Sequence, residues 1–171
     1  IKAKVLKIVL QKNYSNFEIF TLNVINTAYK SNPIAIKVHL DGDCDQIEVS
    51  NRLIGLGFDP VNVVLAHVDR NINYVVFDDL IGKGFFLGFD TFIRASESEI
   101  DRIYDAVLRF PNHVLIGGDL ARSSRYLAYG GGPGLKYVSE TVVKKVREIS
   151  GEDLLNKVLV ENPKRWLNSG I

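Results

Sequence analysis

The feature that most constrains the fold of this chain is a series of short, largely apolar runs that recur at nearly even spacing. The runs cover 3–10, 34–38, 63–66, 85–89 and 114–116. Runs of this length are typical of strands buried on both faces of a parallel sheet. From the second run onward, a polar residue follows, and these residues are 28, 23 and 29 positions apart: His39, His67, Asp90 and Asp119. Each interval is about the length of one strand–helix unit.

The segments between the runs carry helix signals. Ser15 with Glu18, and Ser96 with Glu99, form capping-box patterns, each followed by apolar residues at helical spacing. Asn71 is predicted to cap a third helix, which carries the apolar residues Ile72, Val75, Val76 and Leu80.

Three further helices are predicted from weaker patterns. One covers about 45–56, another carries the apolar residues of 138–149, and the last carries those of 154–159 and is expected to end before Pro163. Strands that alternate with helices predict a parallel sheet with right-handed crossovers.

Two α/β layouts fit this alternation, an open doubly wound sheet and a (β/α) barrel. In barrel enzymes the active site gathers at the carboxyl ends of the strands. Here four successive predicted strands end at an ionisable residue, which favours the barrel. The chain of 171 residues is long enough for one domain or a part of a larger one, and its 46% hydrophobic residues suffice for a sizeable core.

Composition excludes several classes of function. The net charge of +1 gives no electrostatic reason to expect a nucleic acid or an anionic membrane as partner. The single cysteine, Cys44, rules out an internal disulfide and a multi-cysteine zinc site. We find no run long enough to span a bilayer and no signal peptide, and we expect a cytoplasmic setting.

His39, His67 and Asp119 are candidate metal ligands, because neutral imidazoles and a carboxylate suit zinc and related metals. The alternative is that both histidines are satisfied core residues and that Asp119 caps a helix. His113 precedes its strand, so we expect it on the surface at the opposite end of the sheet. Cys44 lies in an acidic loop, which would raise the pKa of its thiol and argues against a nucleophile.

Six segments in this order resemble the phosphotriesterase family of the amidohydrolase superfamily. They are "IKA", "KVHL", "LAHVDRN", "FFLGFD", "IGGDLAR" and "LVENPKRWL". The resemblance covers nearly the whole chain and implies a (β/α)₈ barrel of the TIM type. By this match the single domain, 1–171, is the C-terminal part of a metal-dependent hydrolase barrel and covers roughly strands 4 to 8 with their helices.

The resemblance also implies a cofactor and a ligand set. Two divalent metal ions, usually zinc, bind at the barrel mouth. His39 and His67 match the ligands of one metal, and Asp119 matches a ligand of the other that also accepts a proton. "IKA" matches Lys2 to a carbamylated lysine that bridges the metals. The family's His-x-His motif is absent from these 171 residues, so we expect the chain to pair with a missing N-terminal half or to associate with itself.

Two hypotheses for function follow. The first is a zinc-dependent hydrolase of esters, lactones or phosphotriesters, with Asp119 as the catalytic residue and substrate contacts from three strand-end residues: Arg70, Asp90 and Arg122. The second is a truncated half-barrel without catalysis that serves as a folding or interaction module. Lactone and phosphotriester hydrolases of the family share these ligands and differ in their loops, so the sequence leaves the substrate open.

Overall fold

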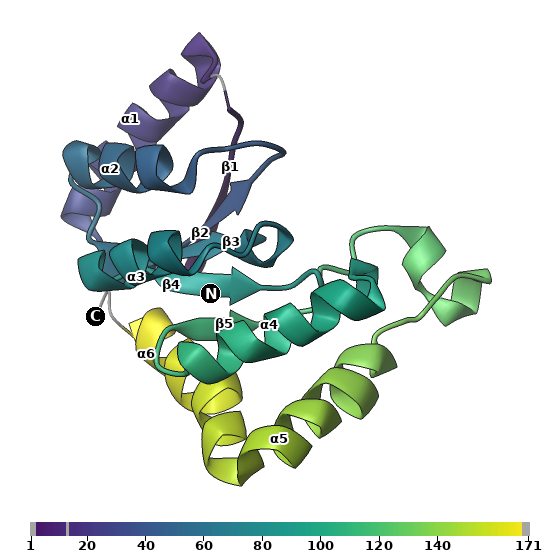
Figure 1. The fold of residues 1–171 in the computed structure, drawn as a ribbon. Coiled ribbons are helices and arrows are strands. Elements are labelled where there is room, and N and C mark those ends of the chain that lie inside the picture. Colours follow the sequence, from purple (N-terminus) through teal and green to yellow (C-terminus); the bar gives the residue numbers. More distant parts are fainter. Residues whose placement is uncertain (1–2, 13, 169–171) are drawn as a thin grey trace.

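The computed structural model describes residues 3–12 and 14–168 and shows an α/β arrangement with five strands (Figure 1). The strands are β1 (Val5–Leu10), β2 (Ala35–Leu40), β3 (Val63–Ala66), β4 (Phe86–Phe89) and β5 (Val114–Ile116). They form one sheet in the order β1-β2-β3-β4-β5, and every neighbouring pair is parallel. The predicted strands are therefore all present, and sequence neighbours are also neighbours in space.

Long helices connect the strands, and shorter helical turns follow them. The α-helices are α1 (Asn16–Ser31), α2 (Gln46–Leu56), α3 (Tyr74–Lys83), α4 (Glu97–Arg109), α5 (Val143–Asn156) and α6 (Asn162–Asn168). π-helical segments at Val138–Val142 and Lys157–Glu161 lead into α5 and α6. Within the described residues, no helix is both long and apolar enough to cross a membrane.

The two predicted capping boxes are confirmed at the starts of α1 and α4. In each, the serine accepts from the backbone of the third helical residue, and the glutamate accepts from the serine backbone. The prediction for α3 was wrong by two residues. Asn73, not Asn71, caps this helix, because its side chain accepts from the backbone N–H groups of Val75 and Val76.

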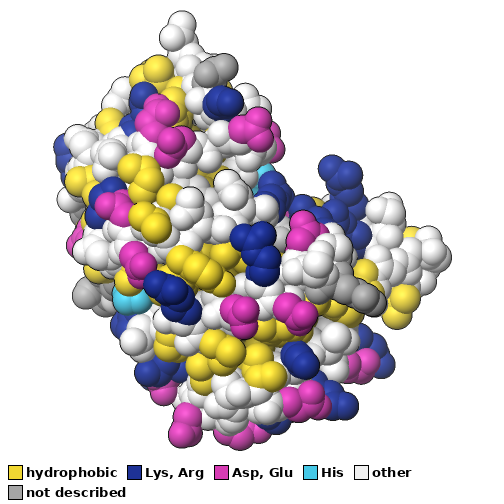
Figure 2. Space-filling model, in the orientation of Figure 1, with side chains coloured by type: hydrophobic (Ala, Val, Ile, Leu, Met, Phe, Trp, Pro, Cys, Tyr) yellow, Lys and Arg dark blue, Asp and Glu magenta, His cyan; other side chains and the backbone are white. Residues whose placement is uncertain are grey.

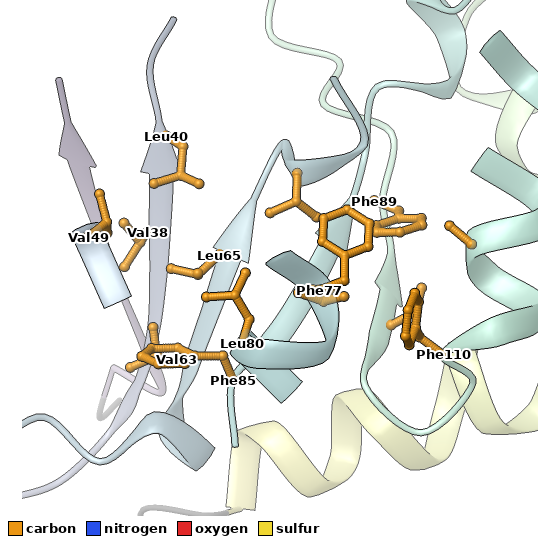
Figure 3. Close-up of a cluster of buried hydrophobic side chains, with 14 of the residues drawn as sticks. Val38, Leu40, Val49, Val63, Leu65, Phe77, Leu80, Phe85, Phe89 and Phe110 are labelled. Atoms are coloured by element: carbon orange, nitrogen blue, oxygen red, sulfur yellow. The ribbon is translucent and has the colours of Figure 1, made fainter. Parts of the chain in front are cut away.

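The outer face of the sheet packs on the helices through one hydrophobic cluster. Alternate strand residues such as Val38, Leu65 and Leu87 are fully buried against helical side chains that include Phe77 and Leu80 (Figure 3). Side chains on successive strand residues point to opposite faces, so the residues between them point to the other, inner face.

The C-terminal helix covers part of that inner face. Trp166 of α6 packs on a small cluster of inner-face residues, Val64, Phe86 and Leu115, and its indole N–H donates to the Asn62 carbonyl at 2.9 Å. The helix was predicted to end before Pro163. Instead the π-helical segment Lys157–Glu161 runs directly into α6, and Pro163 is the second residue of α6, so the chain stays helical through the proline.

Along β1 the inner face is open to solvent. Its burial alternates strictly: Ile8 and Leu10 are buried, whereas Val5 and Val9 are 37% and 49% exposed. No strand pairs with the outer edge of β1 within the described residues. An unpaired edge with exposed β-branched residues is a template for association with another chain.

We expect this edge to make the 171-residue chain self-associate. Val9→Lys should shift the chain toward the monomer, because a charged side chain on an edge strand opposes pairing. Sedimentation velocity at several protein concentrations measures the shift. The matched control is Val75→Lys on α3, where Val75 is already 80% exposed. A wild-type chain that sediments as a monomer at all concentrations contradicts the prediction.

Candidate active site

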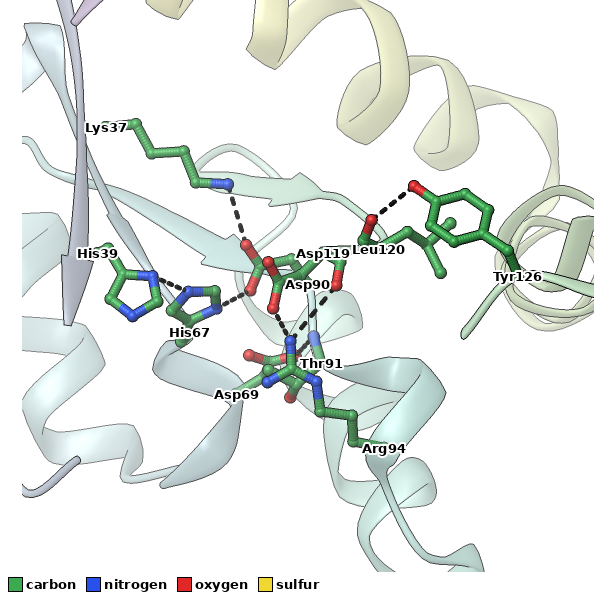
Figure 4. Close-up of polar contacts among 10 residues, drawn as sticks. All are labelled: Lys37, His39, His67, Asp69, Asp90, Thr91, Arg94, Asp119, Leu120 and Tyr126. Atoms are coloured by element: carbon green, nitrogen blue, oxygen red, sulfur yellow. Dashed lines mark hydrogen bonds and ion pairs between the residues drawn. The ribbon is translucent and has the colours of Figure 1, made fainter. Parts of the chain in front are cut away.

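The carboxyl edge of the sheet brings three strand-end residues into one hydrogen-bonded chain (Figure 4). Nε2 of His67 lies 2.6 Å from Nδ1 of His39, and Nδ1 of His67 lies 2.5 Å from Oδ1 of Asp90. His67 and Asp90 are 3% and 2% exposed. The strand ends predicted from sequence to meet at one edge therefore do so for β2, β3 and β4.

Asp90 fixes the tautomer of His67. The carboxylate of Asp90 accepts a hydrogen bond from the Nδ1–H of His67, which leaves the Nε2 lone pair of His67 directed toward His39. The other carboxylate oxygen accepts from Lys37 Nζ at 3.1 Å. Burial alone would raise the pKa of Asp90, but the hydrogen bond from His67 and the charge of Lys37 outweigh it and lower the pKa below its usual value. Asp90 is thus ionised and holds His67 in place; its contact with a substrate stays a prediction.

Two of the predicted site residues have a strained backbone. His67 has φ 69° and Asp119 has φ 39°, and they are the non-glycine residues with positive φ within the described residues. Such conformations cost about 1–3 kcal/mol and cluster at functional sites. That both fall on predicted metal ligands, at the ends of two different strands, supports a functional reading of this edge over two satisfied core histidines.

Asp119 does not join the histidines. Its carboxylate forms an ion pair with Arg94, whose guanidinium also reaches the Asp119 carbonyl oxygen at 3.5 Å. Within the described residues no group of three His, Cys, Asp or Glu side chains is arranged to hold a metal ion. The structure thus brings together two of the four predicted ligands.

The fourth predicted ligand, Lys2, lies outside the described residues. On β1 itself, Lys7 points to the inner face, pairs in register with Lys37, and lines one cavity together with His39 and Asp119. Sequence reasoning missed Lys7. The signal that could have found it is the alternation of β1, since Lys7 has the same parity as the inward-facing Val5 and Val9.

Two neighbouring residues after β3, Asp69 and Arg70, lie in different environments. Arg70 is exposed and lines the cavities on both sides of the histidine pair, as expected for a rim residue. Asp69, directly before it, is by contrast 6% exposed. Its Oδ2 accepts from the Thr91 N–H at 2.7 Å, which ties the segment after β3 to the segment after β4. Burial raises the pKa of Asp69 to about 6.

The electrostatics of the site favour a neutral His39. Burial lowers its pKa to about 4, and repulsion from His67, Lys7 and Arg70 acts in the same direction. A neutral imidazole is the form that ligates metals.

Cys44 and His113 fit no catalytic role. Burial, ahead of the nearby carboxylates, raises the pKa of the Cys44 thiol, and the thiol donates to the Leu10 carbonyl at 3.1 Å. The upward shift of the Cys44 pKa is in the predicted direction. His113 lies at the amino end of β5, as predicted, but it is half-buried because its ring packs 6.0 Å from that of Phe86.

A parallel sheet with helical crossovers and a polar site at the carboxyl ends of its strands is the arrangement found in part of a (β/α) barrel. The profile of the Phosphotriesterase family matches residues 1–167. The chain belongs to this family, as the resemblance of its six segments indicated.

Known relatives show the same fold over a longer chain. The lactonase Lmo2620 from Listeria monocytogenes superposes with a TM-score of 0.88 at 24% identity, covering 98% of this chain and 54% of its own. The phosphotriesterase homology protein from Escherichia coli, solved with phosphate in its active site, superposes with a TM-score of 0.85 at 21% identity. This match covers 98% of the present chain and 60% of the Escherichia coli chain.

A curated relative is also matched in part. N-acetyltaurine hydrolase from Dictyostelium discoideum is 23% identical over 138 residues, which are 71% of this chain and 37% of that protein. The chain therefore spans between about one third and three fifths of the length of these relatives.

We expect the pKa of His39 to rise in Arg70→Gln, because removal of one nearby positive charge lowers the cost of protonating the imidazole. Since the wild-type pKa is about 4, the titration should move toward neutral pH. Imidazole nitrogen shifts in chelator-treated protein, followed by NMR from pH 3 to 8, measure it. The His113 titration, at the other end of the sheet, should not move. An unchanged or lowered His39 pKa contradicts the electrostatic account.

Proposed function

We propose that this chain is the C-terminal part, strands 4 to 8, of a zinc-dependent hydrolase that cleaves ester, lactone or phosphotriester bonds. The observation that carries the proposal is the hydrogen-bonded chain of His39, His67 and Asp90 at the strand ends, in which His67 and Asp90 are buried. Metal-ligating histidines usually donate their second ring N–H to a carboxylate or carbonyl, and His67 has this arrangement with Asp90. Family membership supports the reaction class.

The donor chemistry of the edge fits two divalent metal ions. His39 and His67 supply imidazole nitrogens, Asp119 supplies a carboxylate, and Lys7 is the described lysine on the strand where the resemblance requires a carbamylated lysine. We assign the bridging role to Lys7, whereas the match of "IKA" pointed to Lys2. When bound, such metals lower the pKa of a bridging water and polarise the bond to be cleaved.

The chain's own residues would position the substrate and move the proton. Asp119 would accept the proton of the attacking water once its carboxylate leaves Arg94, and Asp90 would keep the His67 ring oriented. Arg70 and Arg122 lie in the same cavity as Asp119 and are placed to contact the substrate. We further propose that a His-x-His half completes the barrel and, from the unpaired Cys44, that the protein works in the cytoplasm.

The first prediction of this proposal concerns the metal. His67→Ala should lower bound zinc and hydrolysis together. We expect the affinity for zinc to fall by at least about 10- to 100-fold, because mutation of a residue that only hydrogen-bonds to a metal ligand already has an effect of this size. Metal analysis and a zinc titration of the chain, purified alone and together with a barrel half that carries His-x-His, measure it. His113→Ala, at the other end of the sheet, should leave both unchanged.

Lys7→Met should reduce bound metal in the same experiment, and Lys4→Met is its control because Lys4 has the opposite parity to Lys7.

Equal zinc content in wild type and His67→Ala contradicts the metal site. Zinc binding without hydrolysis by the completed barrel would favour the alternative, a half-barrel that serves as a folding or interaction module. The ion pair of Asp119 with Arg94 is the observation that keeps this alternative in view.

The second prediction concerns acid–base chemistry. Asp119→Asn is nearly isosteric and should retain the fold, but turnover should fall by about 10²- to 10⁴-fold because an amide does not accept the proton. Turnover of the completed barrel, with circular dichroism to verify folding, checks it. Near-normal turnover in the folded variant removes Asp119 from the mechanism.

A further inference from the structure

The cavity beside His39 carries an unusual concentration of positive charge. It has a volume of about 380 Å³ and lies at the carboxyl edge of the sheet. Five of the residues that line it are cationic: Lys7, Arg70, Arg94, Arg122 and Arg125. The carboxylates in its lining are those of Asp41 and Asp119. The whole chain has a net charge of only +1, so the excess of positive charge is a local property of this cavity.

One of the five cations is already neutralised. Arg94 forms its ion pair with Asp119. Within the described residues, the side chains of Arg70, Arg122 and Arg125 form no ion pair with a carboxylate. Most of the positive charge in this cavity is therefore available to a ligand.

Arg125 supplies a second observation. Its Nη1 atom is buried and has no hydrogen-bond partner. A charged donor removed from water without an acceptor is unfavourable, so this guanidinium is best satisfied by an anion in the cavity. Arginine forms planar, bidentate hydrogen bonds with carboxylate and phosphate oxygens, which a lysine does not.

The cations come from separate segments that meet only in the folded chain. Arg70 follows β3, whereas Arg122 and Arg125 belong to the segment after β5, and His39 and Asp119 lie in the same cavity. Figure 2 shows basic side chains gathered beside a histidine where the surface is hollowed. An anion held here would place a neighbouring ester or lactone bond next to the candidate catalytic residues.

We propose that Arg70, Arg122 and Arg125 select substrates that carry an anionic group, a carboxylate, sulfonate or phosphate, next to the bond that is hydrolysed. The part of this inference that concerns catalysis rests on the proposed hydrolase function. The part that concerns anion binding does not, because the cations require no metal to hold an anion. The specificity of the enzyme then depends on the charge of the residues that line this cavity.

Binding is tested first, on the 171-residue chain, with inorganic phosphate and sulfate as probes in isothermal titration at low ionic strength. The double variant Arg122→Gln with Arg125→Gln should bind phosphate at least tenfold more weakly. The control removes the same charge elsewhere, Lys144→Gln with Lys145→Gln on the exposed side of α5, and should bind as wild type does. Circular dichroism verifies folding, and Arg122→Lys with Arg125→Lys, which keeps the charge, should recover part of the affinity.

Hydrolysis is tested second, with the completed barrel and paired substrates that differ only in a carboxylate or phosphate group. The ratio of kcat/KM for the anionic over the neutral substrate should fall at least tenfold in the double glutamine variant and stay unchanged in the α5 control. Phosphate binding that is absent or unaffected by the arginine changes overturns the inference, as does an unchanged ratio. If neither substrate is hydrolysed while phosphate binding behaves as expected, the hydrolase proposal fails and the anion site stands.

Discussion

The register of the parallel sheet is the constraint on which the rest of the structure depends. It aligns Lys7 with Lys37 across β1 and β2, and His39 with Ala66 across β2 and β3. Because side chains alternate between faces, this alignment sends one set of residues to the helices and the other to the inner face and its carboxyl edge. A shift of one residue in β2 would bury His39 among the helices and turn Val38 toward the site. Core packing and site assembly are thus specified by the same hydrogen bonds.

The strained backbone of His67 depends on contacts made across β3 and β4. The His67 N–H donates to the Gly88 carbonyl at 3.0 Å, and the side chain is held by Asp90. Two residues further on, Asp69 receives the Thr91 N–H and ties the two segments together. A left-handed conformation persists only when its surroundings determine it, and here three hydrogen bonds do so. The strain and the buried carboxylates are therefore parts of one arrangement that directs Nε2 of His67 into the site.

Much of this was predictable from sequence, for reasons that particular residues make clear. Buried strands and capping boxes are local patterns, so the strand at Val63–Ala66 and the cap at Ser96 follow from a few neighbouring residues. The burial of Asp69 and the inward direction of Lys7 depend on residues of other strands, which no local pattern contains. Asn71 and Asn73 are equally good caps in isolation, and packing of α3 decides between them. The continuation of the helix through Pro163 is likewise set by tertiary contacts, since Trp166 anchors α6 on the inner face.

The ion pair of Asp119 with Arg94 and the open inner face of β1 have a common physical basis. Half of a barrel presents to solvent the residues that closure of the barrel would enclose. Within such a half, the carboxylate of Asp119 pairs with the cation that the same edge of the sheet provides, Arg94. The side chains of this pair are 29% and 16% exposed, so water weakens their attraction, and two divalent ions would compete for the carboxylate on favourable terms. Release of Asp119 would then add Arg94 to a cavity that already carries an excess of positive charge. Metal binding and attraction of an anionic substrate would therefore strengthen each other at this edge of the sheet.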